Sequence, residues 1–272
     1  MPTTTVCFIN QKGGCGKSSS CYHLGGALAG RGLNVLLVDA DPQGSLSQAF
    51  FGSAAVENLA AGETLAAVFD PNAVLADPNR LAVATGFDRL SVIRANQALA
   101  PHNRPEPERE GLTQFLLRDA LADVAGYDLV LIDCPPNLYL SSWNAMLAAD
   151  HVVIPVPPED FGAQGLRVVH QAIELAARLN PRLSLLGHLV TRFDGRLAVH
   201  RAYEQKLRGL YRDSVFEAVV PEASAFKVAL ACRAPVTTYS PKSRAALSMG
   251  HVGDELLGRI ETAGKLNIQS VG

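Results

Sequence analysis

Two lysines flank a glycine-rich run near the start of the chain, in the segment NQKGGCGKSSS at residues 10–20. Its end, GKS, matches the end of the phosphate-binding pattern GxxxxGK[ST], although Gln11 stands where that pattern has its first glycine. The glycines allow several backbone N–H groups to turn toward one anion. Lys17 can then reach the β- and γ-phosphates of a nucleotide, and the Ser18 hydroxyl can ligate Mg²⁺. The segment therefore predicts a nucleoside triphosphate site, and it leaves the second lysine, Lys12, to be explained.

Carboxylates follow two apolar runs further along the chain. Asp39 and Asp41 lie in VDADPQGS (38–45), and Asp133 follows the apolar run of YDLVLIDCPPN (127–137). Carboxylates at the carboxyl ends of parallel strands lie beside the phosphate loop in α/β folds. One of the first pair can hold the hydration shell of Mg²⁺ while the other orients an attacking water, or both are solvated loop carboxylates. The third is in a Walker B arrangement, and we expect it to contact Mg²⁺ through water.

The elements needed to position these groups alternate between strands and helices. Residues 4–10, 19–32 and 34–41 predict a strand, a helix and a strand, which form one βαβ unit. Continuous apolar runs at 127–133 and 150–156 are typical of parallel strands that are covered on both faces. The sequence predicts an α/β fold with one doubly wound, mostly parallel sheet and helices on both faces. We expect residues 1–272 to form a single domain, in which 53–88 has no clear pattern and no assigned role.

Composition and charge limit the kind of protein this chain can be. The chain has 272 residues, of which 48% are hydrophobic and 18% charged, so it can bury a sizeable core. Its net charge of -2 argues against a simple nucleic-acid coat. One segment is nevertheless basic, because residues 178–244 hold 12 Lys and Arg against 5 Asp and Glu, a net of +7.

The cysteines and the termini indicate a reduced compartment. The five cysteines include no CxxC pair and no metal-binding spacing, so reduced thiols are the simplest interpretation. The amino-terminal residues lack the features of a signal peptide, and no apolar run is long enough to span a bilayer. We therefore expect a cytoplasmic protein that does not enter a membrane.

The motifs together resemble one family. KGGCGKSS, LLVDADPQGS and LVLIDCPPN are similar to the deviant Walker A motifs of the ParA/Soj and MinD superfamily of ATPases. The segments at 151–166, 189–196 and 219–246 extend the similarity to ParA and Soj partition ATPases in particular. The resemblance covers nearly the whole chain except about 53–88. Unlike the larger plasmid ParA proteins, this chain is expected to have no helix-turn-helix domain before the phosphate loop.

The resemblance implies a role for each motif. Lys12 occupies the position of the signature lysine, which reaches across a homodimer to the partner's nucleotide and can stabilise transition-state charge. Two ATP molecules with Mg²⁺ would lie between the subunits and be hydrolysed to ADP. Asp41 would position the hydrolytic water, and the segment 157–165 would face the dimer interface. The implied catalytic residues are Lys12, Lys17 and Asp41, the metal-binding residues are Ser18, Asp39 and Asp133, and the nucleotide-binding residues are Gly13, Gly14, Cys15, Gly16, Lys17, Ser18, Ser19, Thr191, Pro221 and Glu222.

Cys15 departs from the family pattern, which has a small aliphatic residue there. One interpretation is a small filler whose backbone binds phosphate, and the alternative is a redox-sensitive thiol. Serines follow the loop lysine where threonines are usual, and they retain the hydroxyl that ligates metal.

The resemblance and the basic segment favour DNA over membrane. The end of the chain has no basic amphipathic stripe of the kind that anchors MinD. We expect the ATP-bound dimer to bind nonspecific double-stranded DNA on the nucleoid, and a ParB-like centromere-binding protein to stimulate hydrolysis. The alternatives are an ATPase that positions a protein cargo on the nucleoid and a MinD-like cell-division ATPase; an iron–sulfur reductase is disfavoured because Cys134 lacks a second partner cysteine. The candidate DNA-binding residues are Arg192, Arg196, Arg201, Lys206, Arg208, Lys227, Arg233, Lys242 and Arg244.

Overall fold

The computed structural model describes residues 3–70, 77–158 and 163–269. Within these residues the strands form one seven-stranded sheet in the order β3-β4-β2-β5-β1-β6-β7. All neighbouring strands are parallel except β3 and β4, which are antiparallel at one edge. The prediction of a mostly parallel α/β sheet is therefore confirmed. The strands are β1 (Thr4–Phe8), β2 (Val35–Asp39), β3 (Ala82–Ala84), β4 (Leu90–Ile93), β5 (Leu129–Asp133), β6 (His151–Val156) and β7 (Ser184–Val190).

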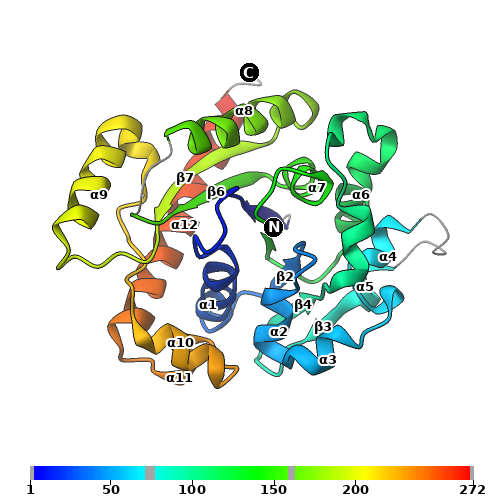
Figure 1. The fold of residues 1–272 in the computed structure, drawn as a ribbon, viewed down its shortest axis with the longest axis horizontal. Coiled ribbons are helices and arrows are strands. Elements are labelled where there is room, and N and C mark those ends of the chain that lie inside the picture. The colour runs from blue at the N-terminus through cyan, green and yellow to red at the C-terminus, as the bar shows by residue number, and fades with distance from the viewer. Residues whose placement is uncertain (1–2, 71–76, 159–162, 270–272) are drawn as a thin grey trace.

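Helices cover both faces of the sheet (Figure 1). Helices α1, α2 and α10 to α12 pack on one face, and α4 to α8 pack on the other. The helices are α1 (Lys17–Ala29), α2 (Ser45–Phe51), α3 (Ser53–Glu57), α4 (Ala66–Phe69), α5 (Pro78–Leu81), α6 (Leu116–Ala122), α7 (Leu140–Ala148), α8 (Ala163–Leu179), α9 (Ala198–Tyr211), α10 (Ser224–Ala231), α11 (Val236–Tyr239) and α12 (Arg244–Gln269). Short 3₁₀ helices are η1 (Ala61–Glu63), η2 (Gln97–His102), η3 (Pro107–Arg109), η4 (Gly111–Phe115) and η5 (Arg212–Ser214).

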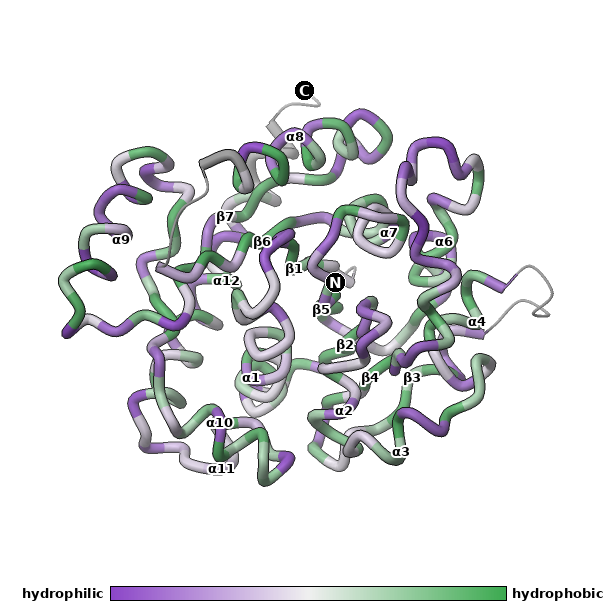
Figure 2. The backbone as a smooth tube through the Cα atoms, viewed as in Figure 1, coloured by the Kyte–Doolittle hydropathy of each residue, from purple (hydrophilic) through white to green (hydrophobic). Residues whose placement is uncertain are grey.

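The core has two halves because side chains alternate along each strand. On β1, Val6 and Phe8 face the half formed with α1 and α12, whereas Cys7 faces the half formed with α7 and α8. Leu36 and Leu37 of β2 divide in the same way. Figure 2 shows hydrophobic residues along the inner strands, and hydrophilic residues alternating with hydrophobic ones along outer helices such as α8 and α9. The continuous apolar runs of the central strands are thus explained by burial on both faces.

Several element boundaries differ from those expected from sequence. The β-branched and apolar segment 90–96 is a strand only as far as Ile93, and the segment 111–125, whose apolar residues have helical spacing, begins as the 3₁₀ helix η4 before α6. The last helix begins at Arg244, because Ser243 caps it by accepting a hydrogen bond from the Ala246 N–H through its Oγ (3.1 Å). The described part of 53–88 contains the short elements α3, η1, α4, α5 and β3.

Candidate nucleotide-binding site

The glycine-rich segment forms a loop between β1, at the centre of the sheet, and α1. Gly14 and Gly16 have φ angles of 70° and 87°, a conformation that residues with a side chain rarely adopt. Gly16 is the N-cap of α1, and no side chain caps that helix end. The N–H groups of the first turn therefore face the loop, where the positive end of the helix dipole favours an anion.

Lys17 is held inside this loop. Its side chain is buried, and its Nζ donates hydrogen bonds to the carbonyl oxygens of Asn10 (2.9 Å) and Lys12 (3.2 Å). Asn10 fixes the start of the loop, because its Nδ2 donates to the Pro155 carbonyl on β6 (2.7 Å) and its Oδ1 accepts from the Lys12 N–H (3.0 Å). The ammonium group is thereby placed where the loop closes around a ligand.

Lys12 lies on the outside of the same loop and is exposed. The two lysines are therefore placed differently, one toward the interior of the loop and one toward the surface. The predicted dimer-facing segment at 157–165 lies partly outside the described residues, since 159–162 are not described.

Asp39 and Asp133 end neighbouring strands and are paired in register. The carboxylate of Asp39 accepts hydrogen bonds from the Ser47 N–H (2.8 Å) and Ser47 Oγ (2.7 Å), so it fixes the first turns of α2. Burial raises the pKa of Asp39 to about 7, against the opposing effect of the Ser47 hydrogen bonds. Its predicted place in a Mg²⁺ hydration shell stays a prediction; Oδ2 already accepts from Ser47, and Oδ1 accepts from the Asp41 N–H (3.2 Å).

Asp133 has a different environment. Both of its carboxylate oxygens are buried without a hydrogen-bond partner among the described residues. Burial, and next the charge of Asp39, raise its pKa well above the usual value, while the nearby Ser18 hydroxyl and Lys17 ammonium lower it. A buried acidic group that lacks a partner is costly. A cation at this position would remove that cost, so Asp133 and Ser18 fit a Mg²⁺ site.

The donor set suits Mg²⁺ better than a metal held entirely by protein. Across residues 3–70, 77–158 and 163–269, no three His, Cys, Asp or Glu side chains converge as a metal site. Mg²⁺ commonly uses one or two protein oxygens and completes its shell with water and substrate phosphates. Asp133 and Ser18 supply that number of ligands.

Asp41 lies at the edge of the cavity described next. Its Oδ1 accepts a hydrogen bond from the Gln43 N–H (2.9 Å), and the side chain is largely buried. Burial raises its pKa, while the Gln43 hydrogen bond and the charge of Lys17 lower it. Its second oxygen is available to orient a water molecule near the phosphate loop.

A cavity of ≈ 470 Å³ opens beside the loop. All ten residues predicted to bind nucleotide line it, from the loop and from the ends of β7 and the segment before α10. Its far wall includes the apolar side chains of Val220, Phe226 and Leu230, which are suited to a nucleotide base. Thr191 joins the end of β7 to the phosphate loop, because its buried Oγ1 donates to the Cys15 carbonyl (2.7 Å).

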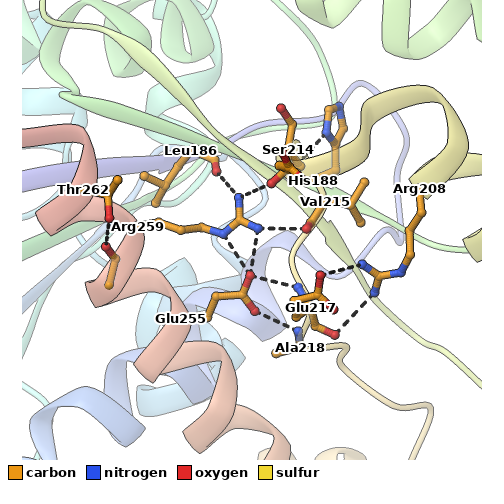
Figure 3. Close-up of polar contacts among 12 residues, drawn as sticks. Leu186, His188, Arg208, Ser214, Val215, Glu217, Ala218, Glu255, Arg259 and Thr262 are labelled. Carbon is orange, nitrogen blue, oxygen red and sulfur yellow. Dashed lines mark hydrogen bonds and ion pairs between the residues drawn. The ribbon is translucent and has the colours of Figure 1, made fainter. Parts of the chain in front are cut away.

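Polar contacts join the last helix to the segment that precedes Val220 of this cavity (Figure 3). Arg259 on α12 donates to the carbonyls of Leu186 (3.0 Å), Asp213 (2.9 Å) and Val215 (2.8 Å). Glu255 accepts a hydrogen bond from Arg259 (2.9 Å). It also accepts hydrogen bonds from the backbone N–H groups of Glu217 and Ala218. These contacts fix the segment that leads into Val220 and Pro221 of the cavity.

Cys15 is fully buried in the loop, and its Sγ lies 3.8 Å from the Lys17 Nζ. Burial raises the pKa of this thiol despite the opposing charge of Lys17. A buried, protonated thiol is a poor nucleophile, which favours the filler interpretation.

The structure places the nine candidate DNA-binding residues in different surroundings, and their predicted contact with DNA stays a prediction. Arg192 and Lys227 line the phosphate-loop cavity. Arg208 is partly buried and pairs with Glu204 (2.9 Å), and Arg233 lies against Gly52. Arg196 and Arg244 line a second cavity next to the first, and the two share the segment 221–223. The remaining candidates, which are all exposed, are Arg201, Lys206 and Lys242.

Sequence reasoning missed several residues that shape the site. No role was predicted from the sequence for Asn10 or Ser47, and the structure shows that both are buried polar residues. Their polar side chains close to predicted strand ends were the signal that could have indicated a role in the site. The roles of Phe226 and Leu230 in the cavity wall depend on tertiary contacts alone.

The fold and the loop define a class, the phosphate-loop α/β nucleotide-binding proteins. A family model described as an AAA domain matches residues 3–185. The chain is 34% identical to the chromosome-partitioning ATPase Soj of Thermus thermophilus, over 95% of this chain and 97% of that protein. It is 33% identical to the chromosome partitioning protein ParA of Myxococcus xanthus, over 93% and 88% of the two chains. The chain therefore belongs to the ParA/Soj family of P-loop partition ATPases.

A solved structure extends the comparison. The cobyrinic acid a,c-diamide synthase of Mycobacterium smegmatis, with bound ADP and magnesium, is 27% identical, with a TM-score of 0.78 over 95% of this chain and 96% of that one. For the helices that the structure describes, none combines the length and apolar character needed to cross a bilayer.

Proposed function

We propose that this chain is an ATP-dependent DNA-partitioning ATPase that segregates a chromosome or plasmid. ATP binding closes a nucleotide-sandwich homodimer, the dimer binds nonspecific double-stranded DNA, and slow hydrolysis to ADP releases it. The observation that carries the proposal is that the two lysines of one loop differ in burial: Lys17 is buried among backbone carbonyls, and Lys12 is exposed.

The site supports binding of ATP with Mg²⁺. Lys17 can exchange its carbonyl partners for phosphate oxygens, and the N–H groups at the start of α1 face the same anion. When bound, Mg²⁺ neutralises phosphate charge, and Asp133 and Ser18 would hold it. The bound ADP and magnesium of the Mycobacterium smegmatis protein support the same ligands here.

Hydrolysis requires a water molecule and positive charge near the terminal phosphate. Asp41 is placed to orient the water, because it lines the cavity with one oxygen engaged by Gln43. Lys12 from the partner would add positive charge to the closed site, as an arginine finger does in other phosphate-loop enzymes. Because the second subunit supplies this charge, hydrolysis depends on the dimer.

DNA binding rests on the exposed cations beside the nucleotide cavity. Arg196 and Arg244 are far apart in sequence, yet they line one cavity that shares residues 221–223 with the nucleotide cavity. Arg201 and Lys206 lie on α9 nearby in sequence. Such cations bind phosphates without reading bases, and a dimer doubles their number. We propose that a ParB-like protein stimulates hydrolysis on the nucleoid.

The test is a gel shift of random-sequence duplex DNA with no nucleotide, with ADP and with ATP, each with Mg²⁺. We expect a shift with ATP only, and none for Lys17→Ala under any condition. Sedimentation under the same conditions should show a dimer with ATP only. Equal DNA binding in all three nucleotide conditions would contradict the proposed cycle.

A further inference from the structure

The end of β7 contacts the phosphate loop at two successive residues. Thr191 donates through Oγ1 to the Cys15 carbonyl (2.7 Å), and the Arg192 guanidinium donates through Nη1 to the Gly14 carbonyl (3.3 Å). Both carbonyls belong to the turn whose N–H groups would bind phosphate. Arg192 therefore lies at the nucleotide site, although its sequence position predicted a DNA contact.

A carboxylate holds the guanidinium from the opposite wall. Arg192 Nε lies 3.1 Å from Glu222 Oε2, and the other oxygen of Glu222 lies 3.0 Å from Lys227 Nζ. Burial raises the pKa of Glu222, but the hydrogen bonds from Lys227 and Arg192 outweigh it, so the pKa is lowered and the carboxylate stays charged. All three side chains line the cavity of Lys17 and Ser18.

The backbone at Arg192 supports a specific role. Its φ angle is 53°, in the left-handed region that residues with a Cβ usually avoid. The neighbouring amides hold it there, because Thr191 N–H donates to the Val156 carbonyl (3.0 Å) and Phe193 N–H donates to the Val220 carbonyl (3.0 Å). An unfavourable conformation that is fixed from both sides turns this side chain back toward the loop.

We infer that Arg192 is a positioning residue for the phosphate loop, and that Glu222 orients it. The guanidinium holds the Gly14 carbonyl toward β7, which leaves the N–H groups of the turn directed at phosphate. The ion pair also joins the cavity wall at Pro221 and Glu222 to the phosphate loop. The two parts of the site are thereby held in a fixed position relative to each other. This inference rests on the proposed nucleotide site.

The experiment measures the dissociation constants of MgATP and MgADP by calorimetry on the full chain. Arg192→Met should weaken both nucleotides by a similar factor of about tenfold, as expected for loss of a charge-assisted hydrogen bond. Glu222→Gln, which keeps the shape but removes the charge, should weaken both to a lesser extent. The double variant should bind like Arg192→Met alone, because Glu222 acts through Arg192.

Two further variants separate this role from others. Lys227→Met removes a cation from the same rim without a contact to the loop, and it should have a clearly smaller effect than Arg192→Met. Arg80→Met, on α5 and outside the cavity, should bind as wild type does and should report any general effect of losing an exposed arginine. The thermal midpoint of the ligand-free Arg192→Met chain should stay within about 2 °C of wild type, since exposed ion pairs contribute little to stability.

Each result is decisive. Unchanged ATP and ADP affinity in Arg192→Met, with wild type binding normally, overturns the inference and leaves the proposed function intact. A loss confined to ATP means direct contact with the terminal phosphate and overturns the positioning role, as does an equal loss in Lys227→Met. Failure of the wild-type chain to bind either nucleotide overturns the proposed function itself.

Discussion

Asp39 and Asp133 lie side by side at the carboxyl ends of β2 and β5, yet among the described residues Ser47 donates two hydrogen bonds to Asp39, while Asp133 has the Ser18 hydroxyl nearby and no hydrogen bond of regular geometry. Two buried carboxylates on adjacent strands repel each other, and the charge of Asp39 helps to raise the pKa of Asp133. One of these acidic groups, Asp39, binds the start of α2, and we propose that the other, Asp133, binds a cation. Asp133 is therefore the first of the two carboxylates to test by substitution.

Asp133→Asn should stabilise the ligand-free chain and weaken its use of Mg²⁺. The pKa of Asp133 is higher in the folded chain than in the unfolded chain, where it is about 4. The folded chain therefore loses stability as the pH rises from about 4 through the folded-state pKa, because the buried carboxyl group loses its proton. The gain in thermal midpoint over wild type should therefore be larger at pH 8 than at pH 5. Affinity for ATP in the presence of Mg²⁺ should fall by tenfold or more, about 1.4 kcal/mol. Asp119→Asn, on the exposed face of α6, should change neither quantity; a lower midpoint for Asp133→Asn at pH 8 would refute the unsatisfied-carboxylate argument.

Lys12→Ala should separate nucleotide binding from dimerisation. Lys17 stays in place through its contacts with backbone carbonyls, so the variant should keep ATP affinity within about tenfold of wild type. The ATP-dependent dimer should be lost, because the partner's site lacks its second lysine. Sedimentation with and without ATP measures this directly, with Lys17→Ala as the variant that loses both. A normal ATP-dependent dimer in Lys12→Ala would exclude the contact across the interface.

Asp41→Ala should bind ATP and DNA but turn over slowly. We propose that the Asp41 side chain orients water, and its hydrogen bond is local, from the Gln43 N–H, so its removal should leave the phosphate loop intact. We expect phosphate release to fall by about 100-fold, within the usual range for a positioned acid or base, and the dimer to stay on DNA. Release of phosphate at the wild-type rate would reject this assignment.

Arg196→Ala combined with Arg201→Ala should weaken DNA binding and flatten its dependence on salt. Arg196 is highly exposed and pairs with Asp194 (2.7 Å), so part of its charge is already compensated, and Arg201 donates to the Gly195 carbonyl (2.6 Å). Each lost phosphate contact should reduce the slope of log K against log salt by about 0.9. Nucleotide affinity should not change. Arg109→Ala on η3 serves as the control, and equal slopes in all three proteins would place the DNA surface elsewhere.

Arg259→Met should lower the stability of the chain and loosen the cavity wall. Its guanidinium binds three carbonyls and Glu255, and it also stacks on the Phe216 ring at 4.4 Å from the centroid. Loss of these contacts should reduce the free energy of unfolding by about 2–4 kcal/mol, as measured by urea denaturation. Hydrogen exchange should increase first at residues 215–220. Arg109→Ala provides the exposed comparison, and a change below 1 kcal/mol would mean that the network is not structural.

The sequence by itself determined the phosphate loop, the mostly parallel sheet and the positions of the main strands. These follow from local rules, because glycine spacing, apolar runs and strand-end carboxylates can be read without knowing the partners of each residue. The ten predicted nucleotide-binding residues line one cavity for the same reason, since most of them belong to one continuous loop.

Only the tertiary structure decided how similar residues divide between roles. Asp39 and Asp133 look alike in sequence, but Asp39 accepts hydrogen bonds from Ser47, whereas Asp133 has the Ser18 hydroxyl nearby and no hydrogen bond of regular geometry within the described chain. Arg192 and Arg196 are four residues apart, yet the left-handed backbone at Arg192 turns it to Gly14 and Glu222 while Arg196 stays at the surface. Such differences depend on which side chains arrive from distant elements, and a charge pattern along the chain does not contain that information.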